Sequence, residues 1–172
     1  MLGCFRGKNE FFSETRDILS ARVQSYIIEE KKYLEAAVIG EIGNNSFDHN
    51  FAFIRNDFPL GVFFCLKYDS KYAVLADYGI GIRQSLSSVV PSINSDLEAV
   101  EAAFTKRISG RFPEQRGNGL KFVSEAIQQN QWHFFLQSGT GACFIDENGM
   151  LFQERAETIN GCLAIMNFNK EN

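Results

Sequence analysis

Two apolar runs of strand length, residues 60–68 (LGVFFCLKY) and 71–78 (KYAVLADY), place the firmest constraint on how this chain can fold. Only a short polar link with Asp69 and Ser70 separates the two runs. Apolar runs of this length, bounded by turn residues, are typical of strands, and two runs joined so closely favour an antiparallel hairpin. The sequence therefore predicts that the fold contains an antiparallel pair of strands.

Helical segments precede this hairpin and follow it. The first forty-odd residues have helical character, with Ser13 as a predicted N-cap and a segment rich in helix formers at residues 29–49. Further helices are predicted in SDLEAVEAAFTKR, where Ser95 and Glu98 fit a capping box, and in GLKFVSEAIQQN. The runs WHFFLQS, ACFID, MLFQE and GCLAIMNF read as four closing strands. This pattern predicts an α+β two-layer α/β sandwich, with helices on one face of a mixed, mostly antiparallel sheet.

The composition narrows the class of protein. A chain of 172 residues suits a single domain, and 45% hydrophobic with 22% charged residues is ordinary for a soluble globular protein. The net charge of −4 and the lack of a basic stripe argue against nucleic acid as a partner, and no apolar run is long enough to span a bilayer. The four cysteines are scattered without a CxxC pair, which favours buried free thiols in a reducing cytoplasm.

The helical segment at residues 29–49 contains polar residues at positions where apolar ones are expected. Glu41, Asn45 and His49 recur every fourth residue, and at about 100° per residue they fall inside the apolar stripe marked by Leu34 and Val38. A carboxylate turned toward a core costs several kcal/mol unless it is paired or solvated. One interpretation is a buried hydrogen-bond network, or a helix whose last turns leave the core. The other is a site, because a carboxylate beside an amide oxygen can orient water and hold Mg²⁺.

A glycine-rich turn follows the second run of the hairpin. In AVLADYGIGI the predicted strand ends at Asp77, and Gly79 and Gly81 come next. Glycines allow strained turns and a close approach of the backbone to a ligand, and a carboxylate at a strand end is a fixed acceptor for an exocyclic amine. A plain glycine turn is the competing interpretation. The segment is neither a dinucleotide fingerprint nor a P-loop, because it lacks the third glycine of the first and the GK[ST] ending of the second.

A second glycine turn precedes a predicted helix. In RGNGLKFV, Gly117, Asn118 and Gly119 lead into the helical segment. A glycine turn at a helix N-terminus offers free N–H groups and the positive end of the helix dipole to an anion. Simple entry into a helix is the alternative.

Taken together and in this order, the three segments resemble the boxes of the GHKL superfamily, which comprises the ATP-binding domains of gyrase, heat-shock chaperones, histidine kinases and MutL. EIGNNSFDH (41–49) resembles the N box in the form found in anti-sigma-factor serine/threonine kinases, DYGIGI (77–82) the G1 box, and RGNGL (116–120) the G2 box. The resemblance implies a single histidine-kinase-like domain over residues 1–172 with a Bergerat-type fold. It further implies an N-terminal helical extension at 1–26 and an ATP lid at 83–116.

The resemblance also implies roles for individual residues. Glu41 would orient or deprotonate the attacking water or hydroxyl, Asn45 would ligate Mg²⁺ at the phosphates, and Asp77 would accept from the adenine amino group. The other positions that the boxes place at the nucleotide are His49, Gly79, Gly81, Ile82, Gly117, Asn118, Gly119 and Leu120. The G1 glycines would let the backbone pass close to the nucleotide, and the G2 box would supply backbone contacts to the phosphates. One departure is Cys162, because the last strand of the family often begins Gly-Thr, and this puts a water-mediated adenine contact in doubt.

Three functions stay open on the sequence. The first is an enzyme that uses ATP and Mg²⁺, either an ATPase or a kinase that phosphorylates a protein partner. The second is a regulatory module in which bound ATP or ADP switches a partner surface with little or no turnover. The third is a structural domain that binds no nucleotide. The N-terminal helix could form a homodimer, or it could pack on its own sheet.

Overall fold

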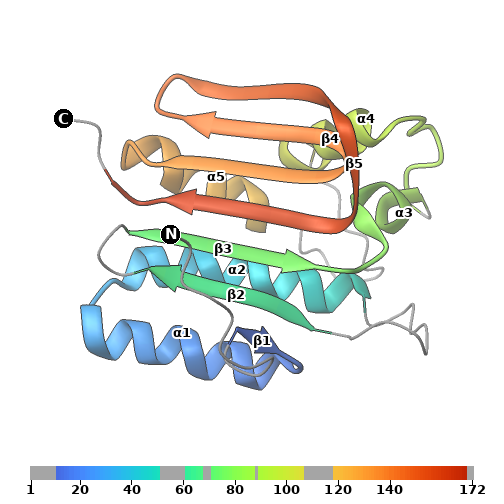
Figure 1. Cartoon of the computed structure of the whole chain (residues 1–172). Coiled ribbons are helices and arrows are strands. Elements are labelled where there is room, and N and C mark those ends of the chain that lie inside the picture. The colour runs from blue at the N-terminus through green and yellow to red at the C-terminus, as the bar shows by residue number, and fades with distance from the viewer. Residues whose placement is uncertain (1–10, 51–60, 68–70, 88, 107–117, 170–172) are drawn as a thin grey trace.

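Helices and strands in the order βααββαααββ make up the fold (Figure 1). The computed structural model describes residues 11–50, 61–67, 71–87, 89–106 and 118–169, without the side chains of residues 49 and 50. The helices are α1 (Arg16–Glu30), α2 (Tyr33–Asn50), α3 (Gly81–Ser87), α4 (Asp96–Thr105) and α5 (Gly119–Gln129). The strands are β1 (Phe12–Ser13), β2 (Val62–Lys67), β3 (Tyr72–Asp77), β4 (His133–Asp146) and β5 (Gly149–Asn167).

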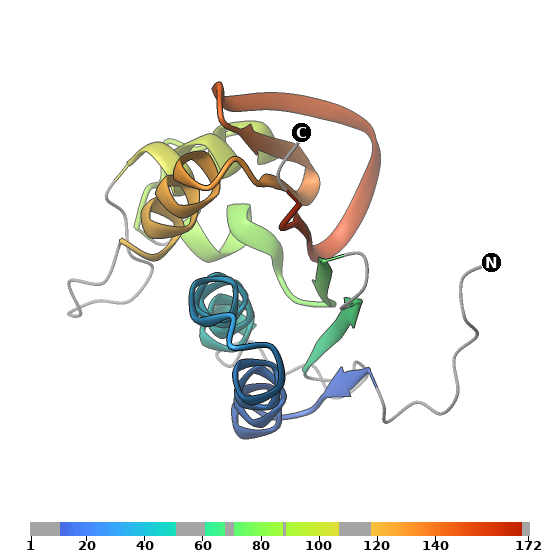
Figure 2. The same ribbon diagram turned by 90° about the vertical axis from the view of Figure 1, so that its left-hand side faces the viewer.

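The strands form one open sheet in the order β1-β2-β3-β5-β4. The helices cover one face of this sheet, as the two views at right angles show (Figures 1 and 2). The α+β class and the placement of the helices on one face are therefore confirmed. The expected mixed sheet is wrong for the described strands, because every neighbouring pair among them is antiparallel. The chain between β2 and β3, and between β4 and β5, is too short for the crossover that parallel neighbours require, so these pairs must be antiparallel.

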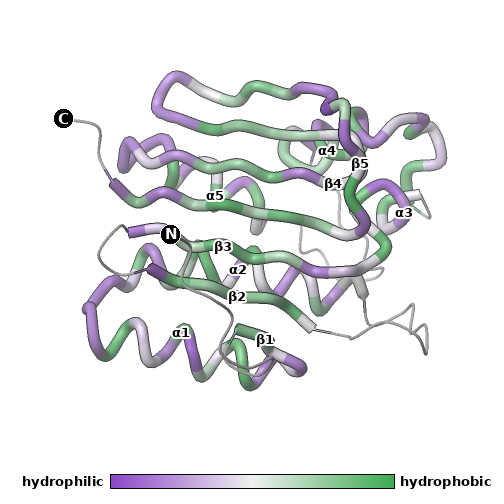
Figure 3. The backbone as a smooth tube through the Cα atoms, viewed as in Figure 1, coloured by the Kyte–Doolittle hydropathy of each residue, from purple (hydrophilic) through white to green (hydrophobic). Residues whose placement is uncertain are grey.

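The strands largely follow the hydrophobic runs of the sequence. Figure 3 shows hydrophobic residues along most of β2 and β3, which pair as the predicted hairpin from Val62 opposite Asp77 to Lys67 opposite Tyr72. The four predicted closing strands are instead two long strands. The register between β4 and β5 shifts around Gly139, where the positive φ of +60° lets the strand change direction without ending.

The core lies between the sheet and the helices. On the helix-facing side, Leu75 of β3, Ala164 of β5 and Leu136 of β4 are at most 4% exposed. They pack in one cluster with buried residues such as Ile39 of α2 and Ile127 of α5. Burying an aliphatic side chain of this size contributes about 1.5–3 kcal/mol, so this layer holds the helices to the sheet.

Helix α1 packs on α2 and belongs to the same core. Its residues Leu19, Val23 and Tyr26 are buried, so the helix packs within its own domain. The predicted N-cap is wrong: Ser13 is buried in β1 opposite Val62, and the N-cap is Thr15. Of the expected extension at 1–26, residues 1–10 lie outside the described part of the chain.

Helices α4 and α5 lie where the sequence predicts them. At the start of α4 the hydroxyl of Ser95 accepts a hydrogen bond from the N–H of Glu98 at 3.1 Å. The carboxylate of Glu98 accepts a hydrogen bond from the N–H of Asn94 at 2.7 Å. In a regular capping box it would accept from the N–H of the N-cap residue itself, Ser95, so the bond is made one residue earlier. The apolar face of α4 includes Val100 and Phe104, and it is buried against the protein's own sheet. The ring of Phe104 meets that of Phe134 edge to face at 6.0 Å.

Candidate functional site

A row of three polar side chains crosses the sheet where β3 ends. Cys162 of β5 is the register partner of Asp77 in β3 and of Ser138 in β4. By strand alternation all three side chains point to the helix-covered face. The next row on this face is apolar, with Ala164 between Leu75 and Leu136. A carboxylate, a thiol and a hydroxyl therefore lie side by side at the edge of a hydrophobic layer, and we call them the polar row.

Asp77 shapes the turn that follows its strand. The side chain is only 5% exposed, and its Oδ1 accepts a hydrogen bond from the N–H of Gly79 at 2.9 Å. Gly81 then begins α3 with a φ of +74°, and a Cβ on this residue would lie 2.9 Å from the Ser138 hydroxyl. The predicted glycine turn is thus a tight connection folded over the polar row, and glycine at 81 is required by both backbone angle and space.

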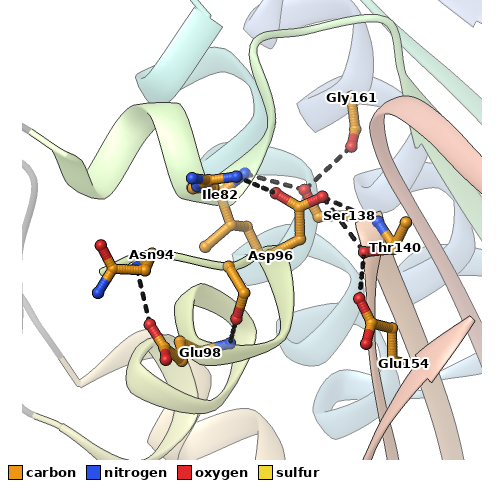
Figure 4. A network of polar contacts seen from close by, with 10 residues as sticks. Ile82, Asn94, Asp96, Glu98, Ser138, Thr140, Glu154 and Gly161 are labelled. Atoms are coloured by element: carbon orange, nitrogen blue, oxygen red, sulfur yellow. Dashed lines mark hydrogen bonds and ion pairs between the residues drawn. The ribbon is translucent and has the colours of Figure 1, made fainter. Parts of the chain in front are cut away.

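The Ser138 hydroxyl joins this turn to the sheet. It accepts a hydrogen bond from the N–H of Ile82 at 2.9 Å and donates one to the carbonyl of Gly161 at 3.1 Å (Figure 4). Ser138 is 2% exposed, so both bonds form in the interior. Ser138 is not among the residues predicted from the sequence, although the run SGTGA that begins with it is unusually rich in small residues for a strand.

Gly161 brings β5 against the end of β3. Its φ is +81°, and a Cβ at this position would lie 2.7 Å from the N of Gly79 and would overlap the carbonyl of Asp77. No side chain fits at this point without moving the turn that carries Asp77.

We expect Gly161→Ala to lower the free energy of unfolding by about 2–4 kcal/mol, from the strain of a left-handed alanine and the cost of overpacking. Urea unfolding measures this loss. Gly149→Ala is the matched control, because Gly149 also has a positive φ (+139°) but has nothing within 4 Å of the added Cβ. Equal losses in the two variants would show that the close approach to Asp77 contributes nothing.

The thiol of Cys162 stays protonated beside Asp77. Burial raises its pKa well above the ordinary value, and the negative charge of Asp77 raises it further. The Ser138 hydroxyl and the N–H of Ile82 act in the opposite direction and only partly offset this. The polar row therefore presents one carboxylate and two neutral groups.

Burial also raises the pKa of Cys143, from 9.0 to about 12. A raised folded-state pKa means that this contribution to stability is full below pH 9 and is lost as the pH rises toward 12. We expect the unfolding free energy of the wild type to fall above pH 9 more steeply than that of Cys143→Ala, by up to about 1.4 kcal/mol per pH unit. Urea unfolding at pH 8, 9 and 10 measures the difference, and parallel curves would contradict it.

The second part of the candidate site lies on α2. The buried arc of this helix is centred on Ile39, which is fully buried, while Leu34 is 37% exposed. The apolar stripe expected around Leu34 is therefore displaced, and the expectation that Glu41 and Asn45 point into the core is wrong. Both are half-buried: Asn45 lies just outside the buried arc, whereas Glu41 lies on the side of α2 nearly opposite Ile39. Within the described residues, neither side chain makes a hydrogen bond or an ion pair.

Glu41 meets the start of α5. A Cβ on Gly119, the first residue of that helix, would lie 2.6 Å from Cδ of Glu41, so the carboxylate packs against the glycine backbone. Asn118 is at the N-cap position but makes no side-chain capping bond, and Leu120 packs against the core. The structure thus brings the first and third segments singled out in the sequence together. A carboxylate near a helix N-terminus is also favourable by itself, because it faces the positive end of the helix dipole.

Helix α2 runs along β3, so that its C-terminal half lies toward the end where β3 reaches Asp77 (Figure 1). Gly43 makes this packing close, because a Cβ there would lie 3.1 Å from Leu75 of β3. Asn45 is one helical turn beyond Glu41 on the same side of α2. His49 belongs to α2, but its side chain lies outside the described residues, as does Gly117.

Helix α4 is attached to the sheet next to the polar row. The carboxylate of Asp96 accepts a hydrogen bond from the N–H of Thr140 at 3.0 Å (Figure 4). Gly139 and Gly141 leave the space for it: a Cβ on Gly139 would lie 3.1 Å from Cβ of Asp96, and one on Gly141 would lie 2.7 Å from N of Leu97. Helix α4 belongs to the segment that was expected to be an ATP lid, and it is held to β4 by this contact. Residues 88 and 107–116 of that segment lie outside the described part of the chain.

A groove of about 510 Å³ lies elsewhere on the sheet. Phe135 and Ile165, two of its lining residues, alternate with the helix-facing Leu136 and Ala164, so they point to the face that the helices leave uncovered. The groove is therefore separate from the polar row.

No family model matches this chain, and no curated protein matches it either. Within the described ranges, no group of three or more His, Cys, Asp or Glu side chains could hold a metal ion. No helix there has both the length and the hydrophobicity to cross a membrane.

Proposed function

We propose that this chain is an ATP-binding protein of the GHKL type that, with Mg²⁺, hydrolyses ATP or phosphorylates a protein partner. The observation that carries the proposal is the buried Asp77 at the end of β3, held by Gly79 in a polar row at the margin of an apolar layer. Its Oδ1 is already used by Gly79, and a carboxylate has a second oxygen with which to accept from an amine. That chemistry suits the exocyclic amino group of adenine.

The residues of α2 and α5 suit the phosphate end of the same ligand. In this proposal the phosphates lie at the N-terminus of α5, where Gly119 and Leu120 offer N–H groups and the helix dipole attracts anions. Asn45 supplies an amide oxygen, which is a ligand type that Mg²⁺ accepts together with phosphate oxygens. The half-buried and unpaired state of Asn45 within the described residues fits such a role.

Glu41 is the residue that we assign to the chemistry. Its carboxylate packs against Gly119, so a water or hydroxyl held by Glu41 would lie close to a phosphate at the start of α5. Phosphoryl transfer depends mainly on positioning, on charge neutralisation and on an oriented nucleophile. In this assignment Glu41 would accept the proton of the nucleophile, and the N–H groups at the start of α5 would offset part of the negative charge on the phosphates. When bound, Mg²⁺ supplies the positive charge that the three phosphates require.

Thermal unfolding with Mg-ATP tests the proposal. A ligand at 100 times its dissociation constant stabilises the folded state by about 2.7 kcal/mol. For a chain of this size we expect the midpoint to rise by roughly 5–10 °C. Mg-ATP should have this effect and Mg-GTP should have a much smaller one, because guanine presents a carbonyl where adenine presents its amine. A midpoint that neither nucleotide moves would contradict the proposal.

A further inference from the structure

One hydroxyl in the protein interior connects two backbone segments that are distant in sequence. Ser138 of β4 is bonded to the N–H of Ile82, 56 residues away, and to the carbonyl of Gly161, 23 residues away. The two bonded groups lie on either side of the turn that follows Asp77. Ile82 is in the first turn of α3, where a helix N–H has no partner within its own helix. Figure 4 shows the serine between its two partners.

These bonds act on the backbone around Asp77. Gly161 approaches Gly79 so closely that a Cβ would lie 2.7 Å from its nitrogen, and Gly79 in turn donates to the Asp77 carboxylate at 2.9 Å. Because one hydroxyl bonds both Gly161 and Ile82, it restrains the backbone on both sides of the turn that follows Asp77. The Ser138 side chain does not itself have to touch a ligand to have this effect.

The chemistry of the position favours a specific use of the hydroxyl. The two preceding helix-facing residues of β4, Leu136 and Phe134, are apolar and buried. A small apolar side chain would continue this layer but would remove the Ser138 oxygen that accepts from the N–H of Ile82, which is unfavourable for a buried donor. The hydroxyl thus serves the turn rather than the packing of the sheet.

We propose that Ser138 is a positioning residue for nucleotide binding, which holds the turn from Asp77 to Ile82 in the geometry that receives the adenosine end of the ligand. The inference rests on the proposed function of the same site. In this proposal Ser138 contributes to the affinity for the adenosine moiety, while binding of the phosphates depends on residues of α2 and α5. Ser138→Ala should therefore weaken binding of ADP and ATP without weakening binding of a bare polyphosphate.

The test measures the affinity of Ser138→Ala for Mg-ADP, Mg-ATP and magnesium tripolyphosphate by calorimetry. We expect roughly 10-fold weaker binding of both nucleotides and unchanged binding of tripolyphosphate. Hydrogen exchange of the Ile82 amide should be at least about 10-fold faster in the variant, because its acceptor is gone. Ser138→Thr, which keeps the hydroxyl, should restore slow exchange and nucleotide affinity.

Ser124→Ala is the matched control. Ser124 is also buried, and its hydroxyl also donates to a backbone carbonyl, that of Lys121, but it lies on α5 away from the polar row. This variant should leave all three affinities unchanged. If Ser138→Ala is too unstable to purify, Ser138→Thr and Ser138→Gly are compared in its place, with the same expectation for the variant without a hydroxyl.

The outcomes separate the two proposals. Wild-type protein that binds nucleotides, together with a Ser138→Ala variant that binds them equally well, overturns the inference and leaves the proposed function intact. Equal weakening of nucleotides and tripolyphosphate also overturns it, because Ser138 would then support the site only as a whole. Wild-type protein that binds no nucleotide overturns the proposed function and the inference with it.

Discussion

Replacing Glu41 with glutamine should lower the rate of ATP turnover by about 100-fold to 10,000-fold, which is the range that a positioned general base contributes. The carboxylate is half-buried, packs against Gly119 and makes no hydrogen bond or ion pair within the described residues. It is therefore available to take a proton from a water or hydroxyl near the start of α5. Glutamine keeps the shape of the side chain but cannot accept that proton. Phosphate release, or transfer of labelled phosphate to a partner, measures the effect.

The affinity for Mg-ATP should not fall in Glu41→Gln, because the substitution removes a negative charge from the neighbourhood of the phosphates. Glu29→Gln, an exposed change on α1, is the control and should leave both turnover and affinity unchanged. Undiminished turnover in Glu41→Gln would remove Glu41 from the chemistry. Tight nucleotide binding with no turnover in the wild type would instead favour the regulatory module over the enzyme.

The second large effect is expected at the other end of the site. Asp77→Asn should weaken Mg-ATP binding by roughly 10-fold to 150-fold, the equivalent of losing a hydrogen bond to a charged group. The Asp77 oxygen bonded to Gly79 at 2.9 Å would remain as an amide oxygen, and the new NH₂ group would then face the adenine amine, donor against donor. Calorimetric titration with Mg-ATP measures the loss.

The selectivity of the Asp77 variant is as informative as its affinity. The wild type should prefer ATP to GTP, and Asp77→Asn should lose most of this preference, because an amide can donate to the carbonyl of guanine. Asp17→Asn, at an exposed position in the first turn of α1, is the control and should bind as the wild type does. Retention of full affinity and selectivity in Asp77→Asn would show that the base is recognised elsewhere or not at all.

Signals between residues close together in the sequence are sufficient to predict most of the helices and strands. The capping pair Ser95 and Glu98 marks the start of α4, and the alternation of apolar runs with short polar turns marks the hairpin of β2 and β3. These features depend on residues close together in the chain. The length of β4 was missed because a strand that bends at Gly139 has the same sequence signature as two strands joined by a turn.

The details of the candidate site were less predictable because they depend on tertiary packing. Leu34 and Ile39 are equally apolar, and only the position of α1 and the sheet decides that Ile39 is buried while Leu34 is exposed. With Ile39 buried, Glu41 lies nearly opposite on the helix and packs against the start of α5 instead of pointing into the core. The polar row escapes sequence analysis for a similar reason, since the pairing of Ser138 with Cys162 and of Cys162 with Asp77 is set by strand register.

Titration of isotope-labelled protein with Mg-ATP, followed through its backbone amide resonances, tests most directly whether these separate segments form one nucleotide site. We expect saturable shifts at Gly79, Ile82 and Cys162 for the adenosine end and at Gly119 for the phosphate end, with one common dissociation constant. Shifts confined to the groove lined by Phe135, or no shifts at saturating Mg-ATP, would contradict it.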